Sequence, residues 1–144
     1  MTVWYRAPVE ISTDKTRLDV AMIHETLARM YWSPGIPRDI VERAIANSLC
    51  FGAYHTGAQV GFARVVSDCA TFAYLCDVFV VPEWRGRGIA KRLMECIKSH
   101  PDLQGLRRWM LATRDAHGLY AQFGFTAISA PDRFMEIHDP HVYS

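Results

Sequence analysis

The sequence predicts one α/β domain in which helices pack on a mixed β-sheet. Apolar runs typical of strands alternate along the chain with apolar residues at helical spacing. A strand-like run at 71–81 is followed by an amphipathic helical pattern and then by another strand-like run at 107–113. A strand reached through a helical crossover normally lies parallel to the first. With 144 residues, of which 50% are hydrophobic and 22% charged, the chain is long enough for one core but not for two.

The first third of the chain is expected to supply one strand and two helices. A short strand is predicted over 8–13, after which Asp14 or Thr16 can cap a helix that runs to the loop at 33–37. The proline and glycine residues of that loop end the helix, and a second helix is predicted over 40–49. The apolar stripes of both helices indicate that they lie on the sheet.

The middle of the chain is expected to form a three-stranded meander followed by a helix. Strand-like runs at 50–55 and 59–67 are joined by a hairpin turn at 56–58. A polar turn then leads into the central strand, 71–81. The helix predicted over 88–99 is apolar on one side and charged on the other, as expected for a helix that covers a sheet.

The last third is expected to close the sheet. A strand at 107–113 is followed by a helix over 116–123, which Asp115 can cap, and by a hairpin of strands 125–129 and 134–138. Adjacent parallel strands such as the central strand and its partner can separate at one end and leave a slot. The expected architecture is a mixed sheet of about seven strands flanked by about four helices.

Glycines and cationic side chains gather where the central strand leads into the next helix. The first amides of a helix have no partner within it, so this loop can direct N–H groups and the positive end of the helix dipole at an anion. Glycines let a phosphate approach the backbone, and arginine can bind a phosphate through two hydrogen bonds. The predicted phosphate-binding residues are Arg85, Gly86, Arg87, Gly88, Ile89, Ala90 and Lys91.

The spacing of the loop distinguishes it from two familiar phosphate motifs. A GxGxxG motif would need glycine where Lys91 stands, and the chain contains no GxxxxGK[ST] string. The pattern [RQ]xxGx[GA] does fit, over 85–90, directly after a strand. In this form the stretch resembles the coenzyme A loop of the GCN5-related N-acetyltransferases (GNAT). The LYAQFGF string at 119–125 is similar to the family's LYxxxGF motif, and the order of elements over 8–138 resembles the family's fold.

The resemblance implies an acetyl-CoA N-acyltransferase fold and an enzyme that transfers the acetyl group of acetyl-CoA to a primary amine by direct attack in a ternary complex. Tyr120, in the second motif, would donate a proton to the departing thiolate. The backbone of the central strand at Val78, Phe79 and Val80 would bind the pantetheine arm. Thr113 occupies the place of an asparagine that contacts this arm in the family.

The resemblance does not identify the base that deprotonates the amine. Some family members have a glutamate where this chain has Arg108, so that base cannot be carried over. Asp77 on the central strand is the first candidate and His117 the second, because His117 lies one helical turn before Tyr120. Deprotonation through water would require neither residue, and both Asp77 and Tyr120 could instead have structural roles.

The acceptor is expected to be a small-molecule or peptide amine, bound near Tyr31 and Trp32, although both could be core aromatics. The alternative function is a non-catalytic acyl-CoA-binding module, which would have no need of an acid at Tyr120. Neither the amine nor the use of longer acyl-CoAs follows from the sequence. Monomer and homodimer both stay open.

Composition and cysteine spacing indicate where the protein acts and what it does not bind. A net charge of +1 disfavours nucleic acid as a partner. The absence of a long apolar run and of a signal pattern at the N-terminus favours a cytoplasmic protein without membrane association. The four cysteines form no CxxC pair, which disfavours zinc. The two histidines at 138 and 141 lack a third ligand, so no metal is expected.

Overall fold

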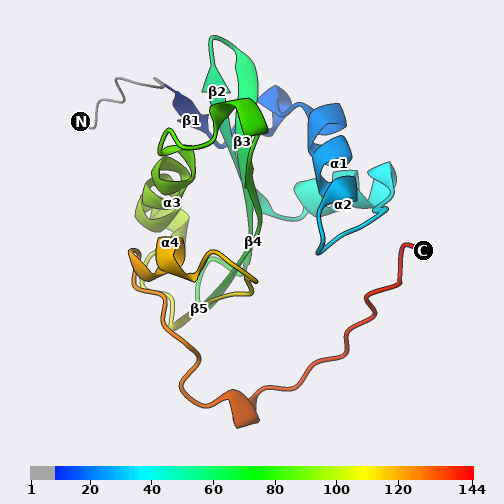
Figure 1. The fold of residues 1–144 in the computed structure, drawn as a ribbon. Coiled ribbons are helices and arrows are strands. Elements are labelled where there is room, and N and C mark those ends of the chain that lie inside the picture. Colours follow the sequence, from blue (N-terminus) through cyan, green and yellow to red (C-terminus); the bar gives the residue numbers. More distant parts are fainter. Residues whose placement is uncertain (1–8) are drawn as a thin grey trace.

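A computed structural model describes residues 9–144 and places a five-stranded mixed sheet at the centre of the molecule (Figure 1). The sheet order follows the chain order, and only the β4–β5 pair is parallel. The predicted parallel arrangement of the central strand and its partner is therefore confirmed. The strands are β1 (Glu10–Ser12), β2 (Leu49–His55), β3 (Ala58–Ser67), β4 (Phe72–Val80) and β5 (Arg108–Leu111).

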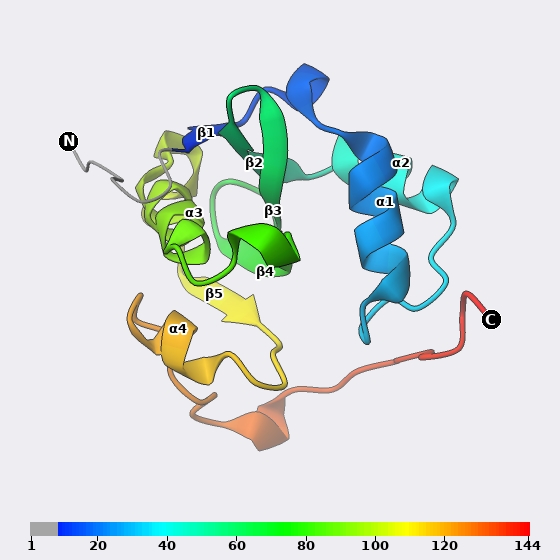
Figure 2. The same cartoon turned by 45° about the horizontal axis from the view of Figure 1, so that its top comes forward.

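Four α-helices flank this sheet, as predicted. Figures 1 and 2 show α3 and α4 on one side of the sheet and α1 and α2 on the other. Among residues 9–144 no helix has the length and apolar character required to cross a membrane. The helices are α1 (Val20–Arg29), α2 (Arg38–Ala46), α3 (Ile89–Ser99) and α4 (His117–Ala121).

An apolar cluster fills each side of the sheet. On the α3 side, Leu93, Met94 and Ile97 are fully buried against β2, β3 and β4. Their i, i+1, i+4 spacing places them on one face of α3, as the sequence pattern predicts. On the opposite face of the sheet, Ile23 and Leu27 of α1 pack with residues of α2, β3 and β4. The sheet is thereby held between two layers of helices.

Helix starts differ from those predicted. Asp14 caps the short 3-10 turn at Lys15–Arg17 (η1) and not the α-helix. The helix α1 begins later, and its cap is Asp19, which accepts a hydrogen bond from the Met22 N–H. Both carboxylates follow the same capping rule, so spacing alone did not decide between them. The Pro8 end of the predicted first strand lies outside the described residues.

The C-terminal hairpin predicted over 125–129 and 134–138 does not form a ladder within the described chain. Residues after 125 continue as an extended segment with one 3-10 turn at Pro131–Arg133 (η4), and Figure 1 shows it crossing below the sheet toward the α1–α2 side. The prediction of about seven strands is therefore not confirmed, because neither segment pairs as a strand within residues 9–144.

Candidate active site

The site is organised by the separation of two parallel strands. Pairing between β4 and β5 starts at Phe72 with Arg108 and ends at Leu75 with Leu111. Beyond this point β4 continues to Val80, whereas the chain after β5 turns into the loop that leads to α4. One side of the second half of β4 therefore has no strand partner in residues 9–144, and its backbone groups are available to a ligand.

A β-bulge lies at the same place in β4. Phe62 of β3 is opposite Phe79 and Arg64 is opposite Cys76. Two residues of β4, at 77 and 78, therefore lie opposite one residue of β3, at 63. Asp77, inside the bulge, has a φ of 56°, a left-handed conformation that is uncommon for a residue other than glycine. The bulge changes the direction in which Asp77 and Val78 point, and such bulges are common beside functional sites.

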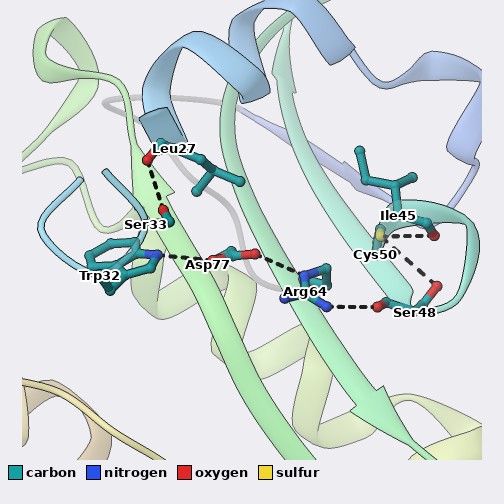
Figure 3. Close-up of polar contacts among 8 residues, drawn as sticks. All are labelled: Leu27, Trp32, Ser33, Ile45, Ser48, Cys50, Arg64 and Asp77. Carbon is teal, nitrogen blue, oxygen red and sulfur yellow. Dashed lines mark hydrogen bonds and ion pairs between the residues drawn. The ribbon is translucent and has the colours of Figure 1, made fainter. Parts of the chain in front are cut away.

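Both carboxylate oxygens of Asp77 accept hydrogen bonds (Figure 3). Trp32 donates to Oδ1 from its indole Nε1 at 2.9 Å, and Arg64 donates to Oδ2 from Nε at 2.8 Å. Arg64 also donates to Ser48 Oγ at 3.0 Å. Burial opposes the charge on Arg64, but the carboxylate beside it raises the pKa of the guanidinium above its usual value. Asp77 is thus the centre of a fixed, half-buried network.

The loop after α1 joins this network to the chain that follows β5. The ring of Tyr31 meets that of Trp32 edge to face at 5.1 Å, and its hydroxyl accepts a hydrogen bond from the Arg114 N–H at 3.1 Å. The guanidinium of Arg114 also lies over the Tyr31 ring, 3.9 Å from its centre. Ser33 holds the same loop by donating to the Leu27 carbonyl at 2.7 Å (Figure 3). Both tyrosine and tryptophan remain 40% or more exposed.

Tyr120 lies on α4 with its ring in the main apolar cluster, where it meets Phe125 edge to face. Burial, with Tyr31 and Asp115 adding to it, raises the pKa of Tyr120 to about 12. No hydrogen bond joins its hydroxyl to another residue between 9 and 144. The phenol is therefore protonated at neutral pH and its hydroxyl is available to a ligand, although the ring also serves the core.

The loop between β4 and α3 contains two glycines in a left-handed conformation. Gly86 and Gly88 have φ values of 76° and 79°, which most other residues avoid, and Gly88 is the N-cap of α3. Space around Gly86 is open. Ile89, the first residue of α3, packs against Gly61 of β3, so close that a methyl group on the glycine would lie 3.3 Å from it. This contact fixes the start of α3 beside the end of β4.

The cations of the loop differ in what they contact. Arg85 donates from Nε to the Val80 carbonyl at 3.1 Å, and so holds the loop to the end of β4. The guanidinium of Arg87 lies over the ring of Trp84, 4.5 Å from its centre, while Arg87 itself stays exposed. Lys91 is exposed on the first turn of α3. Arg87 and Lys91 are the cations best placed to meet an anion from solvent.

Two further predicted residues lie near the start of α4. Thr113 Oγ1 accepts a hydrogen bond from the N–H of Ala116, the residue that precedes α4, at 3.1 Å. Asp115 does not cap the helix, so that prediction is wrong. His117 is exposed as the first residue of α4.

Sequence reasoning missed Arg64 and the bond from Trp32 to Asp77. A charged side chain among the buried residues of β3 was the available signal, because a buried cation normally needs a partner.

Two cavities lie close to, but outside, the opening between β4 and β5. One of about 530 Å³ lies beyond β5, between that strand and residues 123–130. A smaller one of about 70 Å³ lies between α2 and the Arg64–Asp77 pair, with Tyr143 in its wall. Within residues 9–144 no group of three or more metal-ligating side chains is brought together.

Comparison with known proteins shows the family to which the chain belongs. The family model for the acetyltransferase (GNAT) domain matches residues 46–127, which contain β2 to α4. A protein of Gibberella zeae, provisionally named an acetyltransferase, is 32% identical over 142 residues, covering 83% of this chain and 79% of the relative.

Solved structures agree with the family match. A Xanthomonas campestris pv. campestris protein, provisionally assigned as a GNAT-family acetyltransferase, is 56% identical with a TM-score of 0.94, and covers 96% of this chain and 99% of its own. A predicted acetyltransferase of Clostridium acetobutylicum, solved with acetyl-CoA, shares the fold at 16% identity and a TM-score of 0.66, covering 90% and 94% of the two chains. The chain belongs to the GNAT family of acetyltransferases.

Proposed function

We propose that the protein transfers the acetyl group of acetyl-CoA to an amine by direct attack of the amine on the bound thioester. The observation that carries this proposal is the separation of β4 from β5, which leaves unpaired strand backbone between the glycine loop and Tyr120. The fold shared with the Clostridium acetobutylicum protein solved with acetyl-CoA supports the choice of coenzyme.

The pyrophosphate of the coenzyme would lie at the start of α3. The left-handed glycines at 86 and 88 open the backbone, and the first amides of the helix point outward with the positive end of its dipole. Arg87 and Lys91 would add charge from solvent. Arg85 would act through its bond to Val80, by keeping the loop against the strand.

The pantetheine arm would pair with the free side of β4 over Val78, Phe79 and Val80. The two valines and Phe79 point to opposite sides of the sheet, as in a regular strand, so the side chains pack while the backbone stays accessible. An N–H group here could also stabilise the oxyanion of the tetrahedral intermediate, a contribution of about 3 kcal/mol for one donor. Thr113 could still donate its hydroxyl hydrogen to the arm.

In the chemical step the amine nitrogen forms a bond to the acetyl carbon and the carbon–sulfur bond breaks. The departing thiolate would take its proton from Tyr120, which holds that proton at neutral pH because burial raises its pKa to about 12. The resulting phenolate is then reprotonated from solvent. Its raised pKa makes Tyr120 a weaker acid than a solvated phenol, so its contribution depends on proximity to the sulfur.

The proton that the amine must lose goes to a base other than Asp77 in this proposal. Both oxygens of the Asp77 carboxylate already accept hydrogen bonds, from Trp32 and Arg64, and leave little room for an incoming proton. We assign Asp77 a positioning role, and we assign the base role to His117 or to water. Histidine is the side chain that most often acts as a general base in enzymes, and His117 is exposed at the start of the helix that carries Tyr120.

The experiment that tests this function combines two measurements on one sample. Calorimetry measures acetyl-CoA binding, and a thiol-release assay measures turnover against polyamines, amino acids, aminoglycosides and peptide amines. We expect binding together with acceptor-dependent thiol release. Binding without release for any amine would favour an acyl-CoA-binding module, and failure to bind acetyl-CoA in a folded protein would contradict both functions.

A further inference from the structure

A chain of contacts runs around the opening between β4 and β5. Asp77 of β4 accepts a hydrogen bond from Trp32, whose ring meets that of Tyr31. The Tyr31 hydroxyl in turn accepts a hydrogen bond from the N–H of Arg114, which lies in the link between β5 and α4, the helix that carries Tyr120. We call Tyr31, Trp32, Asp77 and Arg114 the acceptor rim, because they surround the place where the proposed amine would meet the thioester.

The two aromatic side chains of the acceptor rim stay accessible to solvent although both take part in these contacts. Tyr31 is 45% exposed and Trp32 is 40% exposed. Tyr31 also adds to the rise in the pKa of Tyr120, an electrostatic effect that weakens with distance and so places the two phenols near each other. The rim therefore offers an incoming acceptor an aromatic wall close to Tyr120.

Asp77 adds little free negative charge to the acceptor rim. Its carboxylate forms an ion pair with Arg64 at 2.8 Å, and its side chain is only 11% exposed. The oxygen that does not face Arg64 accepts the hydrogen bond from Trp32. A second ammonium group, as in a polyamine, could reach this carboxylate only by breaking the half-buried pair, which is costly because it leaves Arg64 without a partner.

Arg114 gives the acceptor rim a positive charge that no carboxylate within residues 9–144 pairs with. The residue is exposed, and its guanidinium lies over the Tyr31 ring, 3.9 Å from the ring centre. Stacking covers a face of this planar group and leaves the N–H groups along its edge able to donate two parallel hydrogen bonds to a carboxylate or a phosphate. The Tyr31 O–H can donate as well, because its bond to the Arg114 N–H uses only a lone pair of the oxygen.

We propose that the acceptor is an amine that also carries an anionic group, a carboxylate or a phosphate, and that Arg114 and the Tyr31 hydroxyl bind this group. The inference rests on the proposed acetyl transfer and names the class of its acceptor. Charge complementarity is the reason, since the rim pairs its one half-buried carboxylate internally and exposes a cation. Asp115, the next residue after Arg114, is exposed as well and would instead attract a cationic acceptor, so the charge of the acceptor distinguishes the two residues.

Binding of acceptor probes tests the anion site without any turnover. Calorimetry on the protein saturated with coenzyme A compares amines that differ in one charge: β-alanine and γ-aminobutyrate, each with its own amide, and O-phosphoethanolamine with ethanolamine. The anionic member of at least one pair should bind about 10-fold or more tightly, and Arg114→Gln should abolish the difference. A preference within the carboxylate pairs or within the phosphate pair identifies the anion. Equal binding within every pair, or binding of neither member, overturns the proposal.

The same pairs then serve as acceptors in the thiol-release assay. For each pair, the kcat/KM of the anionic amine is divided by that of the neutral amine, and this ratio is compared between proteins, so that differences in amine basicity cancel. The ratio should fall about 10- to 100-fold in Arg114→Gln and recover in part in Arg114→Lys, which restores the charge without the planar group. Arg107→Gln is the matched control, because it removes an exposed arginine at the opposite end of β5, and should keep the ratio. An unchanged ratio in Arg114→Gln contradicts the assignment.

The outcomes separate this inference from the acetyl transfer on which it rests. Acetylation of putrescine or of the neutral amines with an efficiency equal to that of the anionic amines would leave the transfer intact and overturn the anionic acceptor. A loss of putrescine acetylation in Asp115→Asn would then assign recognition to Asp115. Binding of anionic amines that depends on Arg114, without thiol release, would support the anion site and contradict the transfer. Neither binding nor release would contradict both.

Discussion

Trp32 donates a hydrogen bond to Asp77 across 45 positions of sequence, and so ties the loop after α1 to the bulge in β4. Together with Arg64 on the neighbouring strand, it occupies the carboxylate that the sequence marks as the first candidate base. We therefore propose a separation of roles, in which Asp77 positions the loop after α1 and another group receives the proton of the amine.

Asp77→Asn tests that separation. The amide keeps an acceptor for Trp32 but removes the charge that faces Arg64, so the free energy of unfolding should fall by about 3 kcal/mol. The pH profile of kcat/KM should keep the midpoint of its acid limb, because the titrating base is still present. A fall of about 10²- to 10⁴-fold with loss of that limb would instead make Asp77 the base.

His117→Gln tests the other candidate base. Glutamine is similar in size and cannot take up a proton, so the acid limb of the kcat/KM profile should disappear if His117 is the base. Stability should change by less than about 0.5 kcal/mol, because the residue is exposed. An unchanged profile in both His117→Gln and Asp77→Asn would assign the step to water.

Gly88→Asp tests the phosphate loop. The variant places a side chain and a negative charge at the N-cap of α3, where phosphate oxygens are proposed to bind, so acetyl-CoA affinity should fall at least about 100-fold. Gly57→Asp is the matched control, since Gly57 also has a positive φ, 86°, with open space around it, but lies in the β2–β3 turn. Calorimetry on the folded proteins compares the two. Equal acetyl-CoA affinity in both would remove the loop from the site.

The cysteines beside the Asp77 network predict a loss of stability at alkaline pH. Burial raises the pKa of Cys50 to about 11 and of Cys76 to about 12, while a thiol in the unfolded chain titrates near 8.5. Above pH ~8.5 the unfolded state releases protons that the folded state keeps, so the free energy of unfolding must fall as pH rises toward 11.

Urea denaturation between pH 7 and 10.5 measures this slope. A Cys50→Ser/Cys76→Ser variant should lose less stability per pH unit than the wild type, whatever its stability at pH 7, because serine does not titrate in this range. Cys69→Ser removes an exposed thiol, which is solvated in both states, and should leave the slope unchanged. Parallel pH curves for all three proteins would contradict the assignment of the slope to the buried thiols.

The sequence predicted those features of the fold that depend on local patterns. The stripe of Leu93, Met94 and Ile97 determines which face of α3 is buried, and the Thr56–Gly57 turn determines the β2–β3 hairpin. The parallel β4–β5 pair followed from the handed crossover through α3. Each of these features requires only residues that are close in sequence or a general rule of chain connection.

What sequence reasoning could not predict depends on pairing between distant segments. The bulge at Asp77 exists because β4 has one more residue than β3 between two successive pairs of opposite residues. No local sequence signal marks this extra residue. The strand pattern at 134–138 was recognised, but a pattern does not specify its partner.

The most direct test of the proposed chemistry is the steady-state kinetics of Tyr120→Phe with an acceptor found in the amine panel. The phenylalanine ring still fills its place in the core, so the KM for acetyl-CoA should change little. General acid catalysis contributes about 10²- to 10⁴-fold, and kcat should fall by that factor. Tyr54→Phe, which removes a hydroxyl from a tyrosine that is only 3% exposed on β2, is the control and should retain wild-type kcat. A kcat for Tyr120→Phe within about twofold of wild type would contradict the proposed role of Tyr120 as the acid.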